Sequence, residues 1–225
     1  MKSKLGYIVL TLAIAQILLI FLSWLITAAA IDLPLRSLLS TEGVRWLFGS
    51  FVANQLTPLL VYFITASIAG GVFVHSKFYD ALRNAFSKGR VNTELAYRER
   101  IGLRLALVEF LLAIVIMLLL TVVPHAILLS VTGQLFPSNF SVSLIPTLSF
   151  ILLVMSLSYG VTSGTINSIQ KLQEMLSVGL ETTAKYLPIY VFGVELYMSV
   201  LYVFQVGVPT SYVIKNPFLF LICAL

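Results

Sequence analysis

Long, uninterrupted runs of apolar residues dominate this sequence and outnumber stretches with one apolar face. A helix needs about 20 apolar residues to cross a bilayer core roughly 30 Å thick. In lipid the backbone must satisfy its own hydrogen bonds, so such runs are predicted to be helical. Five runs reach this length, at residues 5–31, 56–74, 105–123, 142–161 and 186–206. The sequence therefore predicts an all-α integral membrane protein in which residues 1–225 form a single transmembrane domain.

Shorter amphipathic stretches lie between these runs. Ser40 can cap a helix that carries Glu42 in its first turn and is expected to lie on the outer membrane surface. Residues 78–89, with Gly89 as a stop signal, and residues 164–185 also place apolar side chains at helical spacing. We interpret all three as solvated or interfacial connector helices, with docking of a partner as the alternative.

The composition agrees with a membrane protein. Hydrophobic residues make up 59% of the chain and charged residues 10%, whereas soluble domains carry about 25% charged residues. Lys2 and Lys4 precede the first run as they would in a signal peptide. That run is, however, much longer than the apolar core of about 7–15 residues in such peptides. We therefore expect an uncleaved membrane anchor.

Basic residues alternate between the two sides of the predicted spans. With the N-terminus inside, eleven Lys and Arg residues fall on inner segments and three on outer segments, which are Arg36, Arg45 and Lys215. The positive-inside rule thus predicts a cytoplasmic N-terminus and an outer C-terminus. We expect a multi-pass protein of the cell (inner) membrane. Anionic lipid headgroups account for the net charge of +5. Without an aromatic-interleaved basic patch, no nucleic-acid partner is expected.

The residues that carry chemistry are few. A single cysteine, Cys223, excludes an internal disulfide and a multi-cysteine metal site. His75 and His125 fall at opposite faces of the membrane and cannot share a metal ion. The segment 160–164 resembles a nucleophile motif, but its serine stands one position too late. We therefore predict no catalytic residue, no metal, no cofactor and no enzyme activity.

Two acidic residues and three glycines inside the runs are the candidate site residues. Glu109 and Glu195 are costly to place in lipid, so each indicates either a polar contact between helices or a functional site. Glu109 is read mainly as structural, and Glu195, near the middle of its run, stays open between the two roles. Gly70, Gly71 and Gly193 are candidate helix-packing positions, because small residues let helices approach closely in lipid.

Two segments resemble a known transporter family. Residues 37–47, followed by Asn54 and Gln55, a helix with Gly70 and Gly71 and then a basic loop, resemble a part of the p-aminobenzoyl-glutamate (AbgT) transporter family. A second part of this family is resembled by an apolar helix that starts at Leu144 and ends at residues 159–160. Gly-Thr-Ile follows it at residues 164–166. The resemblance implies a membrane transporter of p-aminobenzoyl-glutamate or another organic anion.

The sequence also departs from that family. The resemblance implies extra helices and a re-entrant hairpin between the second and third spans, where this chain has only the basic loop 75–104. A second hairpin and further helices would follow the fifth span. The retained helices therefore resemble the dimer-forming scaffold, with no substrate-binding residue to carry over. We expect a homodimer, or a heterodimer with a longer membrane protein, and the alternative is a non-transporting scaffold or interaction subunit.

Overall fold

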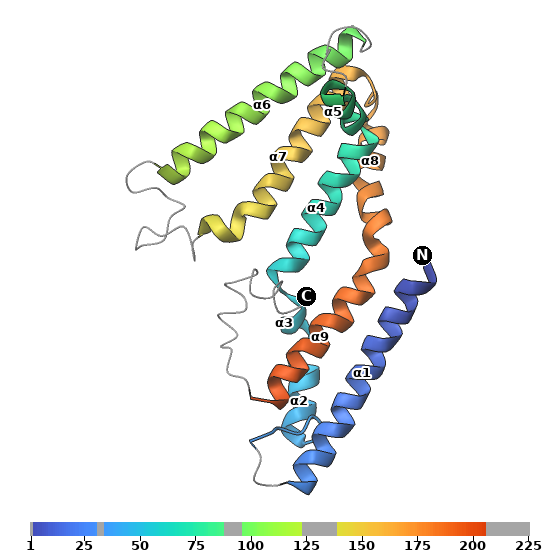
Figure 1. The fold of residues 1–225 in the computed structure, drawn as a ribbon, viewed down its shortest axis with the longest axis vertical. Coiled ribbons are helices and arrows are strands. Elements are labelled where there is room, and N and C mark those ends of the chain that lie inside the picture. The colour runs from blue at the N-terminus through green and yellow to red at the C-terminus, as the bar shows by residue number, and fades with distance from the viewer. Residues whose placement is uncertain (1, 31–33, 88–95, 123–138, 206–225) are drawn as a thin grey trace. The chain divides into compact units, whose positions relative to one another are not determined.

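The described part of the chain is helical. The computed structural model describes residues 2–30, 34–87, 96–122 and 139–205. No β-strand occurs in these residues. Figure 1 shows their elements, which are α1 (Lys2–Ala29), α2 (Thr41–Gly49), α3 (Phe51–Gln55), α4 (Pro58–His75), α5 (Phe78–Ser87), α6 (Tyr97–Val122), α7 (Asn139–Ser163), α8 (Ile169–Thr183), the 3₁₀ helix η1 (Ala184–Tyr186) and α9 (Leu187–Val203).

Five helical segments are long and apolar enough to cross a membrane, which confirms the predicted all-α membrane fold. They are Lys4–Ala29, Pro58–His75, Tyr97–Thr121, Val142–Ser163 and Ile169–Val203. The last is 35 residues long, because α8, η1 and α9 follow one another without a loop. The third begins at Tyr97, well before the predicted residue 105, because the arginines that precede the apolar run are helical too.

The connector helices are present as well. Ser40 caps α2 by accepting a hydrogen bond from the backbone N–H of Gly43 at 3.0 Å, with Glu42 in the first turn. Residues 78–87 form α5, and Gly89 lies outside the described residues. Residues 169–183 form α8 and lead directly into α9.

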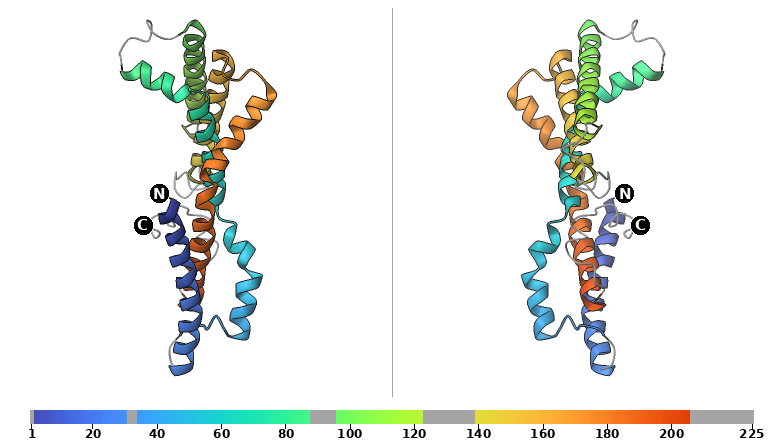
Figure 2. Two further views of the ribbon diagram at one scale, coloured as in Figure 1. Left: turned by 90° about the vertical axis from the view of Figure 1, so that its right-hand side faces the viewer. Right: turned by 90° about the vertical axis from the view of Figure 1, so that its left-hand side faces the viewer.

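The helices divide into two compact units. Unit 1 comprises residues 1–60 and 184–225, and its described helices are α1, α2, α3, η1 and α9. Within it α1 runs beside α9, and α3 contacts α9 as well (Figures 1 and 2). The loop before α2 is fixed to both long helices, because Leu38 donates its backbone N–H to the Ser23 hydroxyl and Arg36 donates to the Val203 carbonyl.

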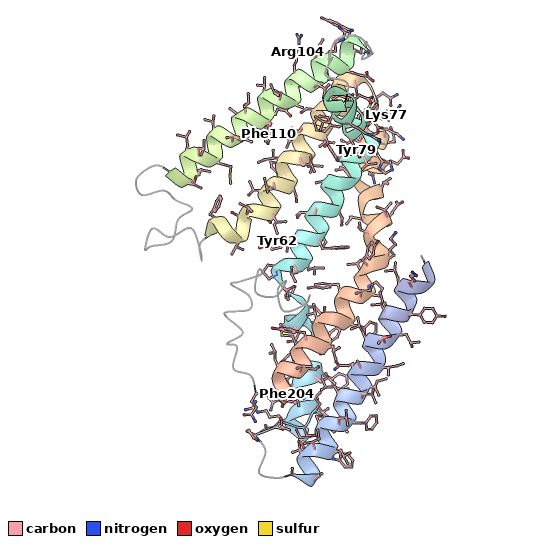
Figure 3. All side chains as sticks on the ribbon, viewed as in Figure 1. Tyr62, Lys77, Tyr79, Arg104, Phe110 and Phe204 are labelled. Carbon is pink, nitrogen blue, oxygen red and sulfur yellow. The ribbon has the colours of Figure 1, made fainter. Side chains whose placement is uncertain are left out.

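Unit 2 comprises residues 61–183, which hold most of α4 and all of α5 to α8. Helix α6 packs along α7, and α5 contacts both. The core joins these three helices through Phe78, Ala81, Ala106 and Tyr159. Near the N-terminal end of α4, the Tyr62 hydroxyl donates a 2.7 Å hydrogen bond to the Val142 carbonyl of α7 (Figure 3).

Candidate functional site

The helical run between α2 and α4 is interrupted inside unit 1. Helix α3 ends at Gln55, Leu56 leaves the helical conformation with a ψ of 60°, and α4 starts at Pro58. Proline disfavours a helical conformation at the residue before it, here Thr57, while its own fixed φ suits the first helical position. The break therefore follows from the sequence and frees the Gln55 carbonyl from regular helix hydrogen bonding.

The Gln55 carbonyl accepts one local hydrogen bond, from the Thr57 backbone N–H at 2.8 Å, and a second one from α9. The Tyr190 hydroxyl donates to the Gln55 carbonyl oxygen at 2.7 Å. It also lies 2.7 Å from the Thr57 hydroxyl. Since the proton of Tyr190 is used by the carbonyl, Thr57 must be the donor of the second bond. Irregular backbone at membrane depth needs such internal partners, because lipid offers none.

Glu195 occupies the middle of α9, next to this break. Its side chain is only 7% exposed, and its Oε2 accepts a long hydrogen bond, 3.5 Å, from the Asn54 amide of α3. One turn earlier on α9, the Gln55 amide donates to the Val191 carbonyl at 3.2 Å. Two consecutive polar residues of α3 thus contact the α9 face that carries the buried carboxyl.

Helix α1 adds a polar contact one turn beyond Glu195. The Gln16 amide donates a 2.8 Å hydrogen bond to the hydroxyl of Ser199, which is fully buried. We call the set of residues that joins α1, α3, the helix break and α9 the polar seam. Its members are Gln16, Asn54, Gln55, Thr57, Tyr190, Glu195 and Ser199.

The polar seam has more acceptors than donors. Within the described residues, Oε1 of Gln16, Gln55 and Glu195 are all buried without a hydrogen-bond partner. A buried acceptor left unpaired costs about 1–3 kcal/mol. A protonated carboxyl carries an O–H donor, so a neutral Glu195 reduces this deficit, whereas an ionised one increases it. The seam is suited to holding helices together through neutral hydrogen bonds.

We expect the two obvious substitutions of Glu195 to differ. Glu195→Gln keeps both an acceptor and a donor at this position and should leave stability nearly unchanged. Glu195→Leu leaves the Asn54 amide unpaired and should destabilise the protein by about 1 kcal/mol, the scale of polar contacts between helices in membranes. Unfolding by sodium dodecyl sulfate, followed by circular dichroism, measures the difference. Equal stability of the wild type and both variants would contradict a structural role for the carboxyl.

The other predicted site residues lie elsewhere. Glu109 is on α6 in unit 2 and so belongs to a different unit from Glu195. Its Oε2 is buried and has no hydrogen-bond partner among the described residues. His75 ends α4, where its Nδ1 lies 2.9 Å from the Gly71 carbonyl. His125 and Cys223 fall outside the described residues. No group of metal-ligating side chains occurs in the part of the chain that the structure describes.

The three candidate packing glycines have different surroundings. A Cβ added at Gly71 would collide with the backbone of Gly179 on α8, so Gly71 is used for close packing inside unit 2. A Cβ at Gly70 or Gly193 would meet nothing within 4 Å in the described structure. Among the described residues, neither of these two glycines is in close contact with another helix.

Sequence reasoning missed most of the polar seam. Gln16, Thr57 and Tyr190 were not singled out, and Asn54 and Gln55 were noted only as part of a family resemblance. A signal was present, because Gln16 is the one amide inside the first apolar run and a proline follows the Asn54–Gln55 pair closely. The pairing of these residues with α9 depends on contacts across more than 130 positions, which no local pattern reveals.

Comparison with known families gives one match. The model of the AbgT putative transporter family matches residues 76–211, more than half of the chain. The matched region includes α5 to α9, and so contains Glu195 and Tyr190, while Asn54 and Gln55 precede it. Neither the curated proteins nor the solved structures contain a match to this chain.

Proposed function

The chain belongs to the AbgT transporter family, and we propose that it is the dimer-forming scaffold part of a transporter for p-aminobenzoyl-glutamate or another organic anion. It is a multi-pass membrane protein of a transport family, and membership of that family fits the absence of enzyme activity expected from the sequence. The proposed scaffold acts as a homo-oligomer or together with a longer partner subunit.

The observation that carries this proposal is that the two faces of α9 have different surroundings. One face of this helix holds the polar seam and is covered by α1 and α3, with Val194, Glu195, Met198 and Ser199 buried. The other face presents Gly193, at which an added Cβ would meet no atom of the described residues within 4 Å, beside the exposed Phe192. Small residues favour close contact between helices in lipid, where apolar area alone gives no preference. The uncovered face therefore suits a second copy of α9.

The limited coverage of the spans supports an assembly as well. Among the described residues, the most apolar 18-residue stretch of α1 has no buried residue, and only 6% of the corresponding stretch of α6 is buried. Lipid covers such surfaces in any membrane protein, so their exposure alone does not identify a partner. In combination with the open glycine on α9, it leaves ample helix surface for contact with another subunit.

The polar seam supports a fixed scaffold more than a moving substrate site. Transporter sites are usually formed by discontinuous helices at mid-membrane that line a cavity. Here the break between α3 and α4 is closed by hydrogen bonds from Tyr190 and Thr57. Between α4 and α6 the described helix α5 has ten residues, about 15 Å at 1.5 Å per residue, half of the bilayer core.

The same closed seam favours one alternative, a membrane scaffold or interaction subunit that takes no part in transport. The transporter scaffold and the interaction subunit are distinguished by the kind of protein that each binds. A transporter scaffold should co-purify with a subunit that restores organic-anion uptake, whereas an interaction subunit should co-purify with a protein of another class.

Particle mass in nanodiscs tests the scaffold directly. We expect native mass spectrometry to find two copies of the chain, because the open α9 face is then paired. Gly193→Leu adds a bulky side chain to that face and should shift the particles to one copy. Gly49→Leu is the matched control, since a Cβ added at Gly49 also meets no described atom within 4 Å, but Gly49 lies on α2. Wild-type particles that contain one copy, with no partner subunit, would contradict the proposal.

A further inference from the structure

An open groove lies in unit 1 where α1 and the start of α9 meet. It has a volume of about 590 Å³, within the range of about 300–1,000 Å³ typical of ligand sites. Its lining combines apolar residues of α1 with one basic side chain from η1 and the proline of the first turn of α9, namely Leu5, Gly6, Val9, Leu10, Ala13, Lys185 and Pro188.

We propose that this groove binds an anionic phospholipid, with one acyl chain along α1 and the headgroup phosphate on Lys185. This inference does not depend on the transporter or scaffold role. It rests on the shape of the groove, on its apolar walls and on the position of its single charged residue.

The length of the groove fits one leaflet. From Leu5 to Ala13 it follows α1 for eight residues, about 12 Å at 1.5 Å per residue. The hydrocarbon core is roughly 30 Å thick, so one leaflet measures about half of that. Leu5 follows directly on Lys4, where the first candidate span begins. The groove therefore starts at the membrane surface and ends before the middle of the bilayer, as a lipid chain does.

Two small residues keep the groove open. A Cβ added at Gly6 would meet no atom within 4 Å, so the glycine leaves space that a larger side chain would fill. Ala13 contributes only a methyl group at the end of the groove that lies nearer the middle of the bilayer. Because no polar atom other than the Lys185 amine is contributed by the side chains that line it, an alkyl chain suits the groove and a polar solute does not.

The positive charge of Lys185, at the end of the groove nearest the membrane surface, favours an anionic headgroup. The Lys185 ammonium lies 5.2 Å from the ring centre of Tyr186, a cation–π contact that orients it. Among the described residues it forms no ion pair, whereas Lys171 is paired with Glu174. The exposed Lys4 lies at the same end of α1. The predicted topology places this end at the cytoplasmic leaflet, where basic pockets between helices bind anionic headgroups.

Lipid retention measured by native mass spectrometry tests this inference. Protein is released from nanodiscs that contain equal amounts of phosphatidylglycerol and phosphatidylcholine, and the lipids that stay bound are counted. We expect the wild type to retain phosphatidylglycerol preferentially. Lys185→Ala should reduce that preference about fivefold, since one lysine near a membrane surface contributes about 1 kcal/mol. Lys185→Arg should keep it, and Lys171→Ala, which removes a paired lysine, should leave it unchanged.

A second variant separates the acyl chain from the headgroup. A Cβ added at Gly6 meets no described atom within 4 Å, so we expect Gly6→Leu to fold. Its larger side chain should fill the groove and lower the retention of both lipids by severalfold. Gly49→Leu, at an equally open position on α2, should retain lipid as the wild type does. Circular dichroism confirms that each variant is folded. An unchanged preference in Lys185→Ala would overturn the proposal. So would a Gly6→Leu variant that retains its lipids but changes the number of chains per particle, because a second copy would then occupy the groove.

Discussion

Replacement of Gly179 by leucine is expected to destabilise unit 2 by about 3 kcal/mol or more. A Cβ at this position would collide with the carbonyl of Ser67 and approach the Cα of Gly71, so the clash is with the backbone of α4. A flexible side chain could move aside, but a helix backbone cannot do so without separating α8 from α4. Overpacking of a well-filled interior usually costs about 1–3 kcal/mol, and a clash with backbone lies at the upper end.

The glycine next to Gly71 provides the control. Gly71→Ala should also destabilise, because its Cβ would meet the Cα and amide nitrogen of Gly179. Gly70→Ala places the same methyl group where nothing lies within 4 Å and should be neutral or stabilising by up to about 1 kcal/mol, since alanine favours a helix over glycine. Unfolding by sodium dodecyl sulfate compares the three variants. Equal stability of Gly70→Ala and Gly71→Ala would contradict close packing of α4 on α8.

This contact shows how a packing motif works in lipid. Ser67 and Gly71 stand four residues apart on α4, and both are buried against Gly179 of α8. Helices in a membrane gain little from apolar contact as such, and small residues four apart allow the close approach that replaces it. The sequence identified Gly71 as a packing residue but did not identify Gly179, which was placed in a solvated or interfacial connector. A glycine's partner on another helix cannot be read from its own surroundings in the sequence.

Local chemistry explains what the sequence predicted well. Apolar run length fixed five spans, since lipid leaves a helix as the only way to satisfy the backbone. Ser40 and Glu42 marked the start of α2 for reasons that lie within one turn. Helix α6 begins at Tyr97, before the apolar run predicted from residue 105, because the charged residues that precede the run are also hydrogen-bonded as a helix. The limits of a helix are set by backbone hydrogen bonding, whereas the length of its apolar run is set by the thickness of the lipid core.

The polar seam shows what local chemistry leaves open. Glu195 was recognised as costly in lipid, yet its partner Asn54 is 141 positions away, and Gln16 and Ser199 are separated by 183. Which polar residues meet is decided by the rotation of each helix about its axis. A uniformly apolar span gives little information on that rotation, because it has no clear polar face. The candidate acid was therefore predictable and its hydrogen-bond network was not.

The proposed scaffold makes a second prediction with a large effect, which is the complete absence of transport by this chain alone. Alternating access requires a site that opens to each side of the membrane in turn. In unit 1 the polar groups that could line such a site hold α1, α3 and α9 together instead, with Glu195 7% exposed and Ser199 fully buried. Opening the seam would leave these groups unpaired in lipid, which is costly.

Uptake of labelled p-aminobenzoyl-glutamate by sealed vesicles that contain only this protein tests the central claim most directly. Empty vesicles set the background, and the vesicles are first shown to hold an ion gradient, so that leakage is not mistaken for transport. The scaffold proposal predicts uptake equal to that of empty vesicles at every substrate concentration and with either a proton or a sodium gradient. Saturable uptake by the pure protein would contradict the account.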